Sequence, residues 1–158
     1  HLSCPPNWMQ GALENTVQGY QGVPGDIHSL IRALGFHAAS EILASFEYSI
    51  IDKVVRHDNR NTGYDAYLRR IHDRVEIEQG LFSAWYWIVI HGKHQGSGVE
   101  DEHFQSALEA LDLASHYRTE SAKQIQQWAL QGFSDFVEIQ QKLFKEITRE
   151  SSEYLQTL

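Results

Sequence analysis

The stretch VEDEHFQSALEAL, Val99 to Leu111, decides the predicted fold because it starts with acidic residues and continues as an amphipathic helix. Positions three apart share a helix face, so Glu100 and His103 point the same way. The same face continues as an apolar stripe through Phe104, Ala107, Leu111 and Ala114. Polar groups on a buried face are costly without partners, so we expect another helix to supply partners for this pair.

Length and composition predict one globular domain that covers residues 1–158. The chain is 42% hydrophobic, 11% aromatic and 22% charged, which is typical of a soluble protein. The alternative is that this sequence forms the C-terminal part of a longer domain. A formal net charge of -8 argues against a broad nucleic-acid footprint and against electrostatic docking on anionic lipid.

Cysteine content and hydropathy favour a cytoplasmic protein without a membrane span. The single cysteine, Cys4, excludes an intrachain disulfide and fits a reducing compartment. The longest apolar run, Leu81 to Ile90, is too short to cross a bilayer and predicts a buried core helix.

The spacing of apolar residues predicts an all-α bundle. The three prolines all lie within the first 24 residues, so long helices are free to form afterwards. Asp26 and Thr119 are placed to cap the helices that follow them. Val75 to Gly80 alternates like a short extended segment. The predicted helices span Asn7 to Tyr20, Ile27 to about His57, Tyr64 to about Arg74, Leu81 to His91, Val99 to Tyr117, and a last one from Thr119.

The Glu-x-x-His spacing of Glu100 and His103 is typical of one helix of a carboxylate-bridged di-metal site. From a single face, the carboxylate can bridge two irons while the imidazole binds one. The alternative is an ordinary acidic helix start, because Glu100, Asp101 and Glu102 also complement the helix dipole.

A second carboxylate, Glu41, lies within the apolar stripe of its predicted helix, three residues after Ala38. A carboxylate there should be paired, protonated or bound to a metal. Its alternative partners are Arg32 or a buried tyrosine hydroxyl. Glu47 lies on the same helix, and its burial is less clear from the pattern.

Two histidines, His91 and His94, follow the most apolar segment and can complete a metal shell. The alternative is a helix C-terminus, where histidine is favourable against the dipole. Asp112 and His116, four residues apart on a polar face, predict a surface pair. No residue is marked as catalytic by its sequence alone.

Three stretches together resemble the haem-oxygenase-like helical superfamily, in the branch similar to the chlamydial death-domain-associated protein. They are LGFHAASEILASFEYSIID (34–52), the segment from SAWYWIVIH to VEDEHF (83–104), and residues 107–140. Many members of this branch bind a non-haem di-iron cluster and activate dioxygen. The resemblance matches Glu41 to a middle-helix ligand, and Glu100 and His103 to the last two members of a late-helix set. The first member of that set falls at Gly96, which is no ligand, so His91 or His94 is expected to replace it.

The resemblance implies a haem-oxygenase-like bundle with a non-haem iron centre, mononuclear or di-iron. Its ligands are expected among Glu41, His91, His94, Glu100 and His103. The expected activity is that of an oxygenase or oxidase that uses dioxygen to oxidise a small organic substrate. The alternative is a metal-free or non-catalytic bundle that binds a partner or an apolar ligand. The sequence leaves homo-oligomerisation open.

Overall fold

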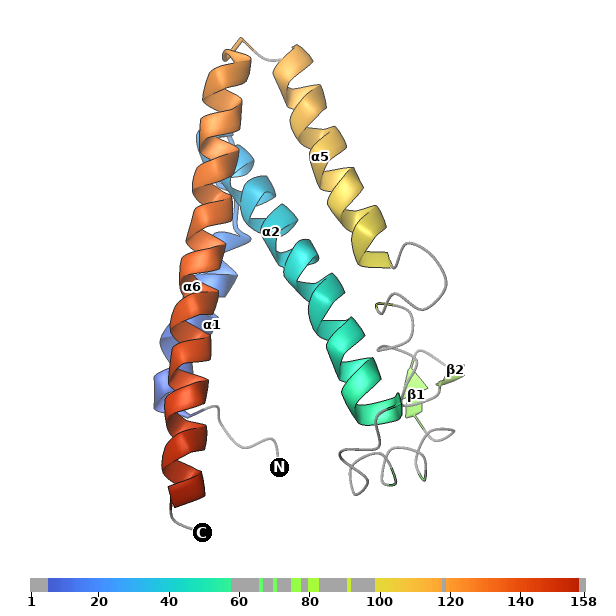
Figure 1. Cartoon of the computed structure of the whole chain (residues 1–158). Helices are drawn as coiled ribbons and strands as arrows, with labels where there is room; N and C mark the ends of the chain where they lie inside the picture. The colour runs from blue at the N-terminus through green and yellow to red at the C-terminus, as the bar shows by residue number, and fades with distance from the viewer. Residues whose placement is uncertain are drawn as a thin grey trace. The chain divides into compact units, whose positions relative to one another are not determined.

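Helices dominate the part of the chain that the structure describes, which confirms the all-α class. The structure is a computed structural model that describes residues 6–57, 66, 70, 75–77, 80–82, 91, 99–117 and 119–156. The elements in these residues are α1 (Asn7–Gly19), α2 (Ile27–Ile51), the π-helical η1 (Asp52–His57), β1 (Val75–Ile77), β2 (Gly80–Phe82), α5 (Val99–Tyr117) and α6 (Ala122–Gln156), shown in Figure 1.

Most predicted element boundaries agree with the observed ones. Helix α5 has the predicted bounds, α1 ends one residue early, and η1 completes the segment predicted to reach His57. The extended segment is confirmed as β1, which pairs antiparallel with β2. The prediction of a helix from Leu81 is wrong at its start, because Leu81 and Phe82 belong to β2. Residues 83–90 and most of 64–74 lie outside the described residues.

The chain separates into two compact units. Unit 1 contains residues 1–40 and 107–158, and unit 2 contains residues 41–106. The core of unit 1 combines α2 and α6, where the rings of Phe36 and Phe136 meet edge to face with centroids 5.1 Å apart. Ile31 and Ile125 are buried in the same core, at 1% and 3% exposure. The single domain expected from the sequence stays a prediction.

Two glycines let α2 and α6 touch backbone to backbone in unit 1. A Cβ added to Gly35 would lie within 3.0 Å of the backbone of Ala129, and one added to Gly132 would meet the backbone of Arg32 as closely. Real Cβ atoms do not approach backbone this closely, so any side chain at either position would force the helices apart. Beside this contact, Arg32 Nε donates to Asp135 Oδ2 at 2.7 Å.

Side-chain caps start α2 and α6. Asp26 accepts a hydrogen bond from the backbone N–H of Ser29, as predicted. The predicted cap of α6, Thr119, is wrong. The cap is Ser121, whose Oγ accepts from the N–H of Gln124 while the side chain of Gln124 accepts from the N–H of Ser121. This reciprocal arrangement is a capping box, and it satisfies two backbone donors where Thr119 would satisfy none.

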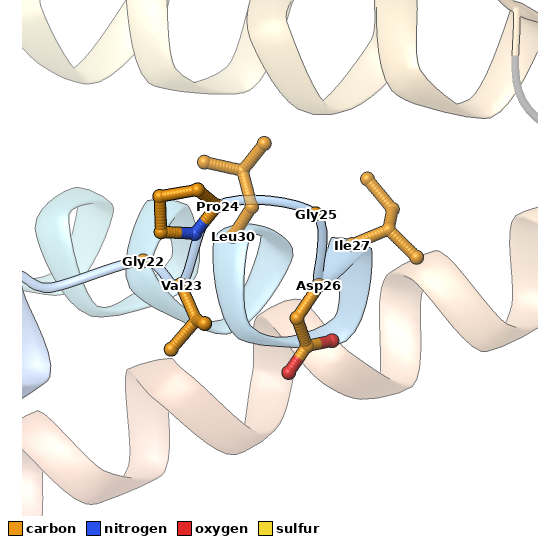
Figure 2. A pocket seen from close by; sticks show the side chains of 7 residues that line it. All are labelled: Gly22, Val23, Pro24, Gly25, Asp26, Ile27 and Leu30. Carbon is orange, nitrogen blue, oxygen red and sulfur yellow. The ribbon is translucent and has the colours of Figure 1, made fainter.

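The turn between α1 and α2 lines a pocket of about 410 Å³ that is open to solvent (Figure 2). Gly25 has a φ of 83°, a conformation that favours glycine, and so allows the chain to turn directly into α2. Pro24, Ile27 and Leu30 lie on one side of the turn, whereas Val23 and Asp26 lie on the other. Half of the Leu30 side chain is exposed to solvent.

Within the described residues, no helix is both long enough and apolar enough to cross a membrane. The predicted core helix at Leu81 to Ile90 lies mostly outside these residues.

Candidate functional site

The candidate site is a polar face of α2 within unit 2. Glu41, Ser45, Tyr48 and Asp52 follow one another at intervals of four, three and four residues, so they lie on one side of the helix and its π-helical end. Three of them are buried, with exposures of 8% for Glu41, 3% for Ser45 and 0% for Asp52. Buried polar groups need hydrogen-bond partners, so this face is the candidate site among the residues of unit 2 that the structure describes.

Glu41 and His103 meet, as predicted from their places in two apolar stripes. His103 Nδ1 lies 3.3 Å from Glu41 Oε2, although 62 residues separate the two in the sequence. The prediction that both side chains are mostly buried is half correct. Glu41 is buried, but the His103 side chain is 49% exposed because it lies in the second turn of α5, where α2 covers only part of the ring.

A second contact continues the pairing of α2 with α5. Ser45 donates from its hydroxyl to Asp101 Oδ1 at 3.4 Å. Moving four residues forward on α2 therefore moves two residues back on α5, so the two helices run antiparallel here, as Figure 1 shows. No local pattern predicts this contact, because an acidic residue at a helix start is favoured by the helix dipole without any further partner.

His91 is buried in unit 2, but it faces a different part of α2 from His103. Its ring lies 4.8 Å from the ring of Tyr48, centroid to centroid, and its exposure is 5%. Tyr48 is seven residues after Glu41, which places it roughly 10 Å further along the helix. The described contact of His91 is therefore with Tyr48, and its role as a ligand beside Glu41 and His103 stays a prediction.

Two predicted ligands lie outside what the structure describes. His94 is not among the described residues, and only the helical backbone of Glu100 is described, as part of the first turn of α5. Among the described side chains, no three His, Cys, Asp or Glu residues converge to hold a metal ion.

The two side chains that do converge have the chemistry of a metal site. Imidazole nitrogen and carboxylate oxygen are both ligands of iron. His103 Nδ1 and Glu41 Oε2 lie 3.3 Å apart, which is also within hydrogen-bond distance, so the two atoms are candidate donors for an ion.

Other titratable groups of α2 differ from Glu41 in their surroundings. Burial raises the pKa of Glu47, which is half-buried and lies off the polar face.

The π-helical turn η1 starts at the fully buried Asp52. Such wide turns are frequent at functional sites, and neither the turn nor the burial of Asp52 was anticipated from the sequence.

Comparisons of the chain with protein-family models, with curated proteins and with solved structures give no match.

Proposed function

We propose that this chain is a non-haem iron protein of the oxygenase or oxidase class, with Glu41 and His103 as two of its iron ligands. The observation that supports this most strongly is the approach of a buried carboxylate and an imidazole from two helices. Helix bundles build iron sites in this way, from inward-facing carboxylates and histidines on facing helices. Further ligands would come from Glu100 and from His91 or His94, on the sequence pattern alone.

In this proposal the bound iron supplies the redox chemistry by which dioxygen oxidises a small organic substrate. The chain's own residues position and protect the site. Burial of Glu41 keeps water from competing for its carboxylate, and the α2–α5 contact between Ser45 and Asp101 fixes the spacing of the two helices one turn away. The half-exposed His103 leaves the site open on one side.

The test is iron content measured by elemental analysis after expression in iron-supplemented medium. Glu41→Ala and His103→Ala each remove one donor, and we expect each to lower iron occupancy at least tenfold. Glu47→Ala is the matched control, because it removes a half-buried carboxylate of the same helix that lies off the polar face. Equal and negligible iron in all four proteins would end the proposal.

A metal-free bundle that binds an apolar ligand is the second candidate. The observation that favours it is the open pocket at the α1–α2 turn, lined by Val23, Pro24, Ile27 and Leu30 among others. Its test is the fluorescence of anilinonaphthalene sulfonate bound to the folded protein. We expect Leu30→Asn to weaken this binding and Leu113→Asn, an exposed leucine on α5, to leave it unchanged.

A further inference from the structure

A second pocket lies within unit 1, where α1 packs along α6 (Figure 1). Its walls come from the end of α1 and from the middle of both α2 and α6, and its volume is about 220 Å³. It shares no residue with the Glu41–His103 site of unit 2. We call it the charged pocket, because four of its lining residues carry a charge: Arg32, Asp135, Glu138 and Lys142.

The apolar part of the charged pocket is held by close packing. Phe36 lines the pocket and is only 1% exposed, because its ring contacts the rings of Tyr20 and Phe136. Gly19 lies directly against the same ring, and a Cβ at this position would overlap it. The ring therefore has little room to move, and this part of the pocket is formed before any ligand arrives.

Two ion pairs give the charged pocket equal numbers of positive and negative groups. Arg32 Nε donates to Asp135 Oδ2 at 2.7 Å, and Lys142 Nζ donates to Glu138 Oε1 at 2.6 Å. A guanidinium and an ammonium each have several N–H donors, and a carboxylate has two oxygens. Within the described part of the chain, each group uses one atom in its pair. The remaining donors and acceptors are available to a ligand.

The α1 wall of the charged pocket adds two side-chain amides. Asn15 and Gln18 are three residues apart and share a helix face. Neither amide makes a side-chain hydrogen bond to another described residue. An amide both donates and accepts, so this wall is suited to a ligand that is polar on more than one side.

We propose that the charged pocket binds a small zwitterion, a free α-amino acid with a polar side chain. Its carboxylate accepts hydrogen bonds from Arg32 and Lys142, and its ammonium donates to Asp135 and Glu138. A simple anion would be attracted by the two cations but repelled by the two carboxylates, and a simple cation would meet the reverse. Only a ligand with both charges gains from all four groups.

The size of the charged pocket agrees with this ligand class. Drug-sized ligands occupy pockets of roughly 300 Å³ or more. The volume of about 220 Å³ suits a smaller molecule, of the size of an amino acid. The amides of Asn15 and Gln18 then face the polar side chain of the ligand. The site belongs to unit 1 and requires no iron, so it stands or falls independently of the proposed function.

The experiment titrates the full chain with L-glutamine and follows the backbone amide signals by NMR. We expect saturable shifts in α1, α2 and α6 around the charged pocket. N-acetyl-L-glutamine has no ammonium group and L-glutaminamide has no carboxylate. Each loses one set of charge-assisted hydrogen bonds and should bind at least tenfold more weakly. Glucose, which is polar but uncharged, should give no saturable shift.

Three variants test the residues of the charged pocket. Arg32→Gln removes the guanidinium and should weaken the binding of L-glutamine at least tenfold. Arg149→Gln is its control, because this arginine is also ion-paired to glutamates but lies outside the pocket, and it should bind as the wild type does. Gln18→Leu removes an exposed amide that supports no described contact, so the fold should be unaffected while binding weakens about fivefold.

Several outcomes would overturn the proposal. They are the absence of saturable shifts with L-glutamine, shifts centred on α5, and equal binding of L-glutamine and either of its singly charged analogues. Saturable binding of glucose would mean that the charged pocket takes uncharged polar molecules instead. Unweakened binding by both Arg32→Gln and Gln18→Leu would show that the ligand lies elsewhere.

Discussion

The same residue types make two different pairs in this molecule, and the difference is burial. Glu41 and His103 approach to 3.3 Å with the carboxylate almost entirely out of solvent. Asp112 and His116 approach to 3.6 Å on α5, with both side chains mostly exposed, as predicted for a surface pair. In water the exposed pair exchanges one set of hydrogen bonds for another and gains little. The buried carboxylate of Glu41 cannot replace a lost partner by water, so the loss of its partner should cost more free energy of unfolding.

This contrast predicts different coupling energies in double-mutant cycles. For Glu41→Gln and His103→Gln, we expect a coupling of about 1 kcal/mol or more in the free energy of unfolding. For Asp112→Asn and His116→Gln, we expect about 0.3 kcal/mol, the value for an exposed helical pair. Urea unfolding of the wild type, single and double variants in metal-free buffer gives both numbers. Equal couplings would show that burial of Glu41 does not strengthen its pair.

Two glutamates should respond to pH in opposite directions. Burial raises the pKa of Glu47, so the folded state binds its proton more readily than the unfolded state does. The folded state is therefore destabilised as pH rises from 4.5 through the raised pKa. Lys142, by a hydrogen bond and its charge, lowers the pKa of Glu138, whose contribution is present above 4.5 and lost as pH falls through the lowered value.

Melting temperatures measured along a pH series test these signs. Glu47→Gln should melt higher than the wild type at neutral pH, and the difference should shrink as the solution is acidified. Glu138→Gln should melt slightly lower than the wild type at neutral pH, with a difference that also shrinks in acid. A lower melting temperature for Glu47→Gln at neutral pH would mean that its charged form is stabilised in the fold.

At the scale of elements, the contact of α2 with α6 depends on glycine where the helices touch. Gly132 stands where a Cβ would meet the backbone of Arg32, whereas a Cβ on Gly11 of α1 would meet nothing within 4 Å. Alanine favours a helix over glycine by about 1 kcal/mol, so the same substitution should have opposite effects at the two positions.

We expect Gly132→Ala to lower the free energy of unfolding by about 2 kcal/mol or more, because backbone cannot move aside as a flexible side chain can. Gly11→Ala should raise it by up to about 1 kcal/mol. Chemical unfolding monitored by circular dichroism measures both. If Gly132→Ala proves as stable as the wild type, the close backbone contact does not exist.

Sequence patterns predicted the helices well and their environment only in part. Apolar periodicity located α1, α2, α5 and α6 because a helix face repeats every few residues. Helical spacing also places Val137, Phe144 and Ile147 on one apolar face of α6, yet each is more than a third exposed. Periodicity gives the direction of an apolar face but not how much of it a neighbour covers.

The candidate site was predictable to the same extent. Glu41 and His103 were paired because each interrupts an apolar stripe, and a polar residue in such a stripe needs a partner. The contacts Ser45–Asp101 and Tyr48–His91 were missed. They depend on the antiparallel register of α2 and α5 and on the place of His91, which no local pattern contains.

At the scale of the whole molecule, two helices pass from one unit into the other. The division between the units falls between Ser40 and Glu41 in α2, and between Ser106 and Ala107 in α5. Neither position is a helix end. Separating the units there would leave four N–H and four C=O groups without helical partners in each helix. It would also divide each helix into two shorter helices, and short helices are less stable than long ones.

The units should therefore unfold together, and hydrogen exchange can detect this. Gly132→Ala perturbs unit 1 alone, where Gly132 touches the backbone of Arg32. We expect its destabilisation to lower the protection of α2 amides around Ser45, in unit 2, as much as those around Phe36, in unit 1. Gly11→Ala adds a methyl group to open space in unit 1 and should lower the protection of neither group of amides. Loss of protection around Phe36 alone would mean that α2 can break at the division and that each unit keeps a stability of its own.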